Sequence, residues 1–194
     1  IYDPARDRMV VSGGFANGSP GYQHDVWTLK LAATPAWSKL TPSWPSGGRD
    51  LHSAIFDPVR DRMLVFGGLE SSATTHNDTW SLSLSGVPAW KQINVLIGGP
   101  TTRCAHSAIY DPVRDRMIVF GGSNEITGNR NDVWALSLAG TPAWSQLTPT
   151  GTPPSPRSEH RAIYDPVRDR MLLFGGYTDS TQWSNEVWEL SLAG

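Results

Sequence analysis

Apolar and polar residues form short runs that are separated by Gly, Pro and Asp. The run Arg116–Phe120 is apolar on both faces after its first residue. The run that begins at Asp132 alternates, with its large side chains on one face: Trp134, Leu136 and Leu138. Short apolar runs and a period of two residues predict β-strands. Because no segment of ten or more residues has a helical period free of Gly and Pro, the chain is predicted to be all-β.

Turn residues join these runs into a unit of four strands. The strands are predicted at His106–Tyr110, Arg116–Phe120, Asp132–Leu138 and Ala143–Leu147. Between them, Asp111–Arg114 reads as a proline turn, and Gly121–Gly122 ends the second strand. The second strand is apolar on both faces, so we expect both faces of the sheet to be covered.

The four-stranded unit recurs every 54 residues. The segment Ile55–Gly68 returns at Ile109–Gly122 and Ile163–Gly176, and a looser copy is Ile1–Gly14. A period of this size predicts a radial array of blades. Residues 1–194 are therefore expected to form a single array with blades that start near 1, 55, 109 and 163, the last blade being incomplete.

Composition narrows the range of partners. The net charge is −2, the only lysines are Lys30, Lys39 and Lys91, and no basic stripe is present, so we expect no nucleic-acid partner. No apolar run has the length of a membrane span, and no membrane partner is expected. Nine Trp, 19 Gly and 15 Pro fit an all-β chain rich in turns. The single Cys104 excludes an internal disulfide framework.

Four hydrophobic residues before a Gly-Gly pair, followed by spaced aromatics, resemble the kelch repeat. Met63–Gly68 followed by Trp80 and Trp90 carries this pattern. Trp80 and Trp134 stand where kelch repeats often have Tyr, which is a mild departure. The resemblance covers essentially the whole chain and implies a kelch-type β-propeller of four-stranded antiparallel blades. It also implies a protein-binding module or, occasionally, an enzyme that acts on sugars.

One face of such an array varies between repeats, and the other does not. The loops between strands two and three and between strands four and one lie on the same face and differ in every repeat. Divergent loops on one rim favour recognition, although drift at exposed loops explains them equally well. Four aromatic side chains in these loops are candidate ligand contacts: Tyr22, Trp44, Tyr177 and Trp183. The opposite face repeats Asp-Pro-Val-Arg-Asp-Arg turns, which are interpreted as salt-bridged hairpins.

Three arginines recur at the entrance to the first strand: Arg49, Arg103 and Arg157. The kelch resemblance implies that arginines at this place line the mouth of the channel and bind carboxylates of a peptide. The alternative is a structural ion pair with an acidic residue of the blade edge, such as Asp78 or Asp132. The structural interpretation is preferred, because repeated charges usually serve the scaffold.

The sequence gives only weak support for a metal site or for catalysis. His52, His106 and His160 recur, but separate blades would hold them too far apart for a metal, so no metal and no cofactor is expected. Kelch copper oxidases need a Tyr–Cys cross-link, and Cys104 has no matching ligand set. Carboxylates for sugar chemistry could come from four acidic residues, namely Glu70, Glu125, Glu159 and Asp179. We therefore expect a non-catalytic propeller that binds a protein segment or a glycan, with a carbohydrate-active enzyme as the alternative.

The fourth repeat is incomplete, and an open arc of blades would leave apolar faces uncovered. Two interpretations stay open. The chain is a segment of a longer propeller, or two copies form a homodimer that closes a ring of about eight blades. Low Lys with abundant Trp, Ser, Thr, Gly and Pro resembles bacterial extracellular kelch arrays, which suggests secretion, and a cytoplasmic location stays open as the alternative.

Overall fold

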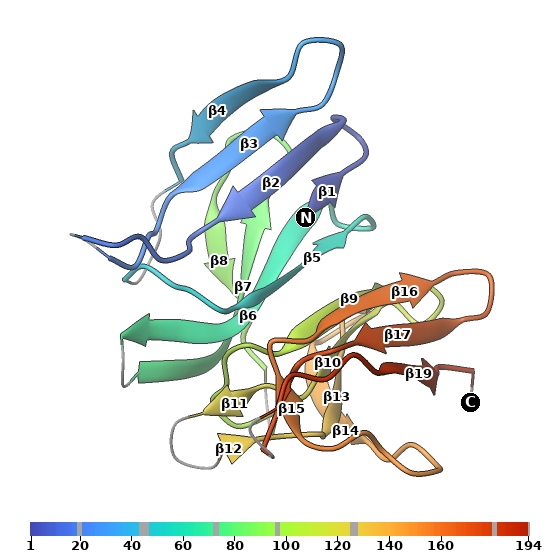
Figure 1. The fold of residues 1–194 in the computed structure, drawn as a ribbon. Coiled ribbons are helices and arrows are strands. Elements are labelled where there is room, and N and C mark those ends of the chain that lie inside the picture. Colours follow the sequence, from blue (N-terminus) through green and yellow to red (C-terminus); the bar gives the residue numbers. More distant parts are fainter. Residues whose placement is uncertain are drawn as a thin grey trace.

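The computed structural model describes residues 1–18, 21–42, 47–71, 74–95, 98–124, 128–179 and 182–193. All regular structure within these ranges is β, as predicted. The described residues include no helix long and apolar enough to cross a membrane. Figure 1 shows the sheets following one another in chain order, as the blades of a propeller do.

Three of the sheets are complete four-stranded antiparallel blades. The first blade contains β1 (Tyr2–Asp3), β2 (Arg8–Ser12), β3 (Val26–Lys30) and β4 (Ala36–Leu40). The second contains β5 (Ser53–Asp57), β6 (Arg62–Ser71), β7 (Thr74–Ser83) and β8 (Trp90–Gln92). The third contains β9 (Ser107–Asp111), β10 (Arg116–Phe120), β13 (Val133–Ser137) and β14 (Ala143–Leu147). The four-stranded antiparallel blades predicted from the repeats are confirmed.

The fourth sheet has three strands among the described residues: β16 (Arg161–Asp165), β17 (Arg170–Phe174) and β19 (Val187–Ser191). Two short ladders complete the fold. One joins β11 (Ser123–Asn124) to β12 (Gly128–Asn129), and the other joins β15 (Arg157–Ser158) to β18 (Tyr177–Thr178). The first strands of neighbouring blades contact each other, β5 with β9 and β9 with β16, so they line the inner side of the arc.

In the second blade, the loop that was expected between the second and third strands is largely a hairpin. In the structure β6 continues past Gly68 to Ser71, and β7 begins at Thr74. Gly68 pairs with His76 and Leu69 with Thr75, and register shifts on both sides of this stretch mark β-bulges. A β-bulge lets a strand bend while it stays paired. Because a bulge interrupts the alternation of residues along a strand, the sequence pattern did not indicate that β6 and β7 continue into this hairpin.

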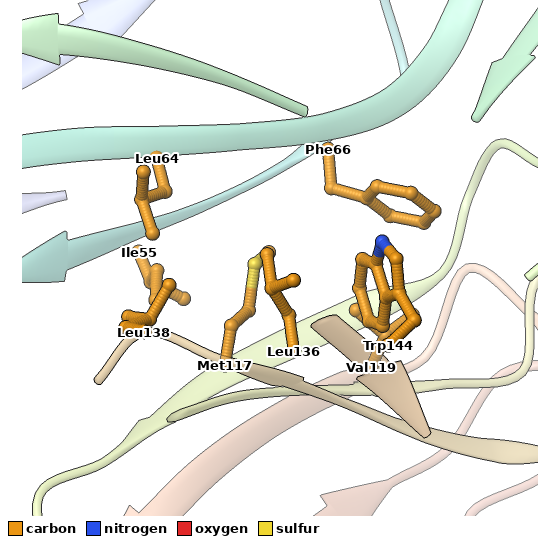
Figure 2. Packing of buried hydrophobic residues seen from close by; sticks show 8 residues of the cluster. All are labelled: Ile55, Leu64, Phe66, Met117, Val119, Leu136, Leu138 and Trp144. Carbon is orange, nitrogen blue, oxygen red and sulfur yellow. The ribbon is translucent and has the colours of Figure 1, made fainter. Parts of the chain in front are cut away.

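The core lies between blades, because the second strand of a blade packs against the blades on both of its sides. In the joint between the second and third blades, Leu64 and Phe66 of β6 face Met117 and Val119 of β10, with Trp144 beside them (Figure 2). The alternate residues of β10 face the fourth blade: Ile118 and Phe120. Apolar burial on both sides of one strand explains its continuous hydrophobic run.

The Asp-Pro-Val-Arg-Asp-Arg turns also bind one blade to the next. Asp57 is fully buried and accepts hydrogen bonds from Arg60 and from Arg62 Nε, the latter at 2.8 Å, so the predicted salt-bridged hairpin is confirmed. Arg60 also reaches both carboxylate oxygens of Asp115 in the next blade, at 3.0 and 2.7 Å. The same contact joins Arg6 to Asp61 and Arg114 to Asp169.

Equivalent residues are exposed where the arc ends. Phe66 and Phe120 are 0% and 4% exposed, whereas Phe174 at the same place in the fourth blade is 57% exposed. At the other end, Trp37 is 55% exposed, whereas its equivalent Trp144 is 8% exposed. The residue type is the same at the equivalent positions, so the difference in burial comes from the presence or absence of a neighbouring blade.

This difference predicts that one substitution has two outcomes. Phe66→Ala leaves a cavity in the joint between the second and third blades and should lower the free energy of unfolding by about 3–5 kcal/mol. Phe174→Ala removes the same ring from an exposed position and should cost about 0.5 kcal/mol or less. Urea unfolding followed by Trp fluorescence measures both variants. Equal losses would contradict the account of the joint.

Candidate binding face

The variable loops of neighbouring blades meet on one face of the arc. The loop before each first strand pairs with the loop after the second strand of the same blade, as in the bridges Asp50–Leu69 and Cys104–Ser123 and in the ladder β15–β18. Each of these loops also bonds to the preceding blade. Gly68 N donates to Arg103 O at 2.9 Å, and Gly122 N donates to Arg157 O at 2.9 Å. The two sets of variable loops therefore form one continuous rim.

The first glycine of each Gly-Gly pair makes this close approach possible. Gly67 has φ +61°, a left-handed conformation that L side chains rarely adopt. A Cβ atom at Gly67 would lie 2.7 Å from Arg103 O and 3.0 Å from the ring of His106. Glycine is thus required at position 67 for two reasons: the positive φ angle and the lack of space for a Cβ atom beside the next blade.

The three repeated arginines are buried within this rim. Arg103 is 0% exposed and donates to both carboxylate oxygens of Asp132, at 2.7 and 2.9 Å, and to Gly121 O at 2.9 Å. Arg49 pairs in the same way with Asp78, and Arg157 pairs with Glu186 at 2.7 Å. The structural ion pair preferred from the sequence is confirmed for Asp78 and Asp132. The exposed basic arc implied by the kelch resemblance is not formed, because these guanidinium groups have almost no exposed surface.

The acidic partners of these arginines are held in the charged form. Burial raises the pKa of the Asp132 carboxyl, but hydrogen bonds from Arg103 and Trp134 outweigh burial, so the net pKa lies below the ordinary value. The same balance lowers the pKa of Asp78, with Arg49 and Trp80 as donors. Each charged pair also fixes a tryptophan, since Trp134 Nε1 donates to Asp132 at 2.7 Å.

The repeated histidines bind the preceding blade. The Nε2 atom of His106 lies 2.8 Å from Ser53 Oγ, and that of His160 lies 3.2 Å from Phe120 O. His160 therefore bonds to the backbone of the preceding blade, whereas His106 bonds to a side chain. Burial, followed by the nearby Arg103, lowers the pKa of His106 to about 3, and burial lowers the pKa of His52 and His160 to about 4.

Two aromatic pairs, each with one exposed ring, lie on the rim in the first and the fourth blade. Phe15 is 54% exposed and packs edge-on against Tyr22, with ring centroids 5.0 Å apart. Trp183 is 69% exposed and packs edge-on against Tyr177, with centroids 5.4 Å apart. Each pair is held by a β-bridge between its own residues. The structure thus brings Tyr177 and Trp183 together and gives Tyr22 a partner in Phe15. The candidate Trp44 lies outside the described residues.

Three of the candidate acidic residues for sugar chemistry lie within the described residues: Glu70, Glu159 and Asp179. Glu70 is bonded to His76 at 2.8 Å in the hairpin of the second blade, and Glu159 lies in the loop before β16 with φ +59°. Glu125 lies outside the described residues. Within the described ranges, no group of three or more His, Cys, Asp or Glu side chains could hold a metal ion.

Comparison with known proteins identifies the family. The profile of the KLHDC2/KLHL20/DRC7 Kelch-repeats domain matches residues 4–192, and the chain therefore belongs to the kelch-repeat family. It is 29% identical over 178 residues to host cell factor homolog hcf-1 of Caenorhabditis elegans. This alignment covers 80% of this chain and 22% of that protein. It is 30% identical over 204 residues to the F-box/kelch-repeat protein At1g51550 of Arabidopsis thaliana, covering 96% of this chain and 40% of that protein.

Solved structures agree on the fold. The structure of YjhT superposes with a TM-score of 0.75 at 15% identity, covering 97% of this chain and 60% of that one. This likeness shows the propeller fold alone. The chain also spans less than half the length of the two curated relatives above.

The buried histidines predict that acid destabilises the fold at an unusually high pH. Their folded pKa values of about 3 to 4 lie below the ordinary value of 6.5, so the unfolded chain binds protons first. Their contribution is complete above about pH 6.5 and is lost as the pH falls toward 4, by up to about 1.4 kcal/mol per pH unit for each histidine.

Urea unfolding between pH 8 and pH 4.5 measures this loss. The variant His106→Gln should have a shallower slope of stability against pH, and His24→Gln, at an exposed position, is the matched control. A stability that is flat from pH 7 to pH 5 would refute the burial of these rings in the neutral form.

Proposed function

We propose that this chain is a non-catalytic interaction propeller that binds a segment of a partner protein on the rim of variable loops. The observation that carries the proposal is the pair of exposed aromatic clusters, Phe15 with Tyr22 and Tyr177 with Trp183. The kelch family supports the same class, because its propellers serve mostly as interaction domains.

The geometry of the aromatic pairs suits recognition. Tyr and Trp supply large contact surfaces with few rotatable bonds, and they dominate the energy of protein interfaces. Here each exposed ring is fixed by a partner ring and a β-bridge, so little conformational freedom is lost on binding. The paired rings therefore favour a preorganised contact over random exposure of loop residues.

The opposite face has a different role. Its repeated turns use their charges in bonds within and between blades, as in Arg60 with Asp57 and Asp115. Three of these turns each expose one valine: Val59, Val113 and Val167. A partner that bound these turns would compete with the contacts that hold the blades together. On the variable rim the contact between blades is made by backbone groups, such as Gly68 N with Arg103 O, so the side chains of the loops can differ between blades.

The arginines do not enter this proposal as contact residues. Arg103 is fully buried and already satisfied by Asp132, so its substitution would report on folding. This separates the proposed site from the carboxylate-binding arc implied by the family resemblance. Partner contacts are assigned to the aromatic pairs and to the β6–β7 hairpin, whose polar end includes Glu70 and His76.

The proposal predicts that rim aromatics control affinity without controlling stability. Peptides selected on the purified chain from a random display library provide the ligand, and a glycan array provides the second arm. Trp183→Ala and Phe15→Ala should each weaken the binding of rim-selected peptides by about tenfold or more, with unfolding free energies unchanged within about 0.5 kcal/mol. The control is Val113→Ser on the opposite face, which should bind normally.

Peptide binding that survives both aromatic substitutions but is lost in Val113→Ser would overturn the proposal. Saturable binding to glycans alone would favour the glycan alternative, and turnover of a bound glycan would favour the enzyme. The ring-closing homodimer stays a prediction. It would cover the exposed Phe174 of one copy with the first blade of the other.

A further inference from the structure

The loop between β2 and β3 contains the only asparagine of the chain that is followed by glycine, Asn17-Gly18. This loop belongs to the variable rim, and it runs between the two members of an aromatic pair, because Phe15 and Tyr22 form a β-bridge and pack edge-on. Both residues of the Asn-Gly sequence are exposed. An Asn-Gly sequence therefore lies in contact with solvent inside a short loop whose ends are held together.

Gly18 leaves its own backbone nitrogen open to attack by a neighbouring group. Gly18 has φ +117°, and no atom beyond its chain neighbours lies within 4 Å of the place where a Cβ atom would be. Glycine has no side chain to screen the nitrogen, and its backbone adopts many conformations. Within the described ranges, neither Gly18 N nor the side chain of Asn17 has a hydrogen-bond partner. The amide of Asn17 can therefore approach the next nitrogen along the chain.

The other asparagines are held in ways that Asn17 is not. In four of them the side-chain nitrogen donates to a backbone carbonyl: Asn77 to Pro100, Asn124 to Thr102, Asn129 to Tyr177, and Asn131 to Pro154. Asn94 is followed by a valine, whose branched side chain crowds the backbone. After Asn185, the nitrogen of Glu186 already donates a hydrogen bond. Among the described residues, only Asn17 combines an unbonded side chain with an unscreened nitrogen after it.

We propose that Asn17 is a site of spontaneous deamidation, which converts a neutral residue of the rim into an acidic one. The backbone nitrogen of Gly18 attacks Cγ of Asn17, and the bond from Cγ to Nδ2 breaks. Ammonia leaves with the proton that the Gly18 nitrogen gives up, and a cyclic imide remains. Water, the only co-reactant, then opens the ring. Cleavage at Cγ gives aspartate, and cleavage at the original peptide carbonyl gives isoaspartate, whose main chain runs through Cβ and Cγ.

Both products change the surface around the aromatic pair. Each adds one negative charge to a chain whose net charge is −2. Isoaspartate also inserts a methylene group into a loop that is closed by the bridge of Phe15 with Tyr22 and by a bond from Ala16 N to Gly21 O at 2.8 Å. The loop must rearrange to accept it, so deamidation should weaken partner contacts made by this pair. This consequence rests on the proposed function, whereas the modification itself does not.

Ageing of the purified full chain tests the modification. After incubation at 37 °C and pH 8, peptide mapping by mass spectrometry measures conversion at each asparagine, and an isoaspartyl methyltransferase labels isoaspartate. Asn17 should convert at least tenfold faster than Asn94 and Asn131. The rate at Asn17 should fall at least tenfold at pH 5, because the attacking amide nitrogen must lose its proton. Asn17→Gln is the matched control and should stay unconverted over the same time, since its longer side chain closes a larger ring more slowly.

Binding by the aged chain tests the consequence for the rim. Peptides selected on the fresh chain are first sorted into those that depend on Phe15 and those that depend on Trp183. The aged chain should bind the first group at least threefold more weakly and the second group normally. Asn17→Gln, aged in parallel, should bind both groups as it does when fresh.

Conversion of Asn17 that is no faster than conversion of the other asparagines would overturn the site, whatever the chain binds. Conversion of Asn17 that leaves the Phe15-dependent peptides bound as tightly as before would overturn its effect on the rim. If no peptide binds the fresh chain, the proposed function fails together with this effect, and mass spectrometry still decides whether Asn17 is modified.

Discussion

The whole arc depends on the joint between neighbouring blades. Each second strand is apolar on both faces, so a blade buries its residues only when another blade lies against it. Phe66 and Phe174 occupy the same place in the repeat, yet they are 0% and 57% exposed. Three contacts recur in each joint: an apolar layer, a bond from a glycine to an arginine carbonyl, and a contact between turns such as Arg60 with Asp115.

The same joint divides the molecule into a constant face and a variable one. On the constant face, the Asp and Arg side chains of the turns form ion pairs within and between blades. Substitution of one of these charged residues would therefore remove a contact. On the variable face, the backbone of the Gly-Gly pair carries the contact, as when Gly68 N donates to Arg103 O. Side chains beyond that pair are released from packing, and this is where Phe15 and Trp183 stand exposed.

Much of the fold could be predicted from the sequence, because the same pattern of apolar strands and turn residues recurs in each repeat. The strands around Arg116–Phe120 and the Gly-Gly turns follow from local periodicity and backbone freedom. The β6–β7 hairpin did not, because it depends on bulges in one blade only. Of the candidate site, the pairing of Arg103 with Asp132 was anticipated. The edge-on contact of Trp183 with Tyr177 was not, since it depends on how one loop folds back.

Native-state hydrogen exchange tests the central claim that the joints, and not the individual blades, stabilise the fold. Amides of β6 and β10, whose strands are covered on both faces, should have the highest protection. Those of β17, with its second face open at Phe174, should exchange at least tenfold faster although the strand has the same sequence pattern. Equal protection in β6, β10 and β17 would mean that each sheet is stable by itself, and would contradict the account.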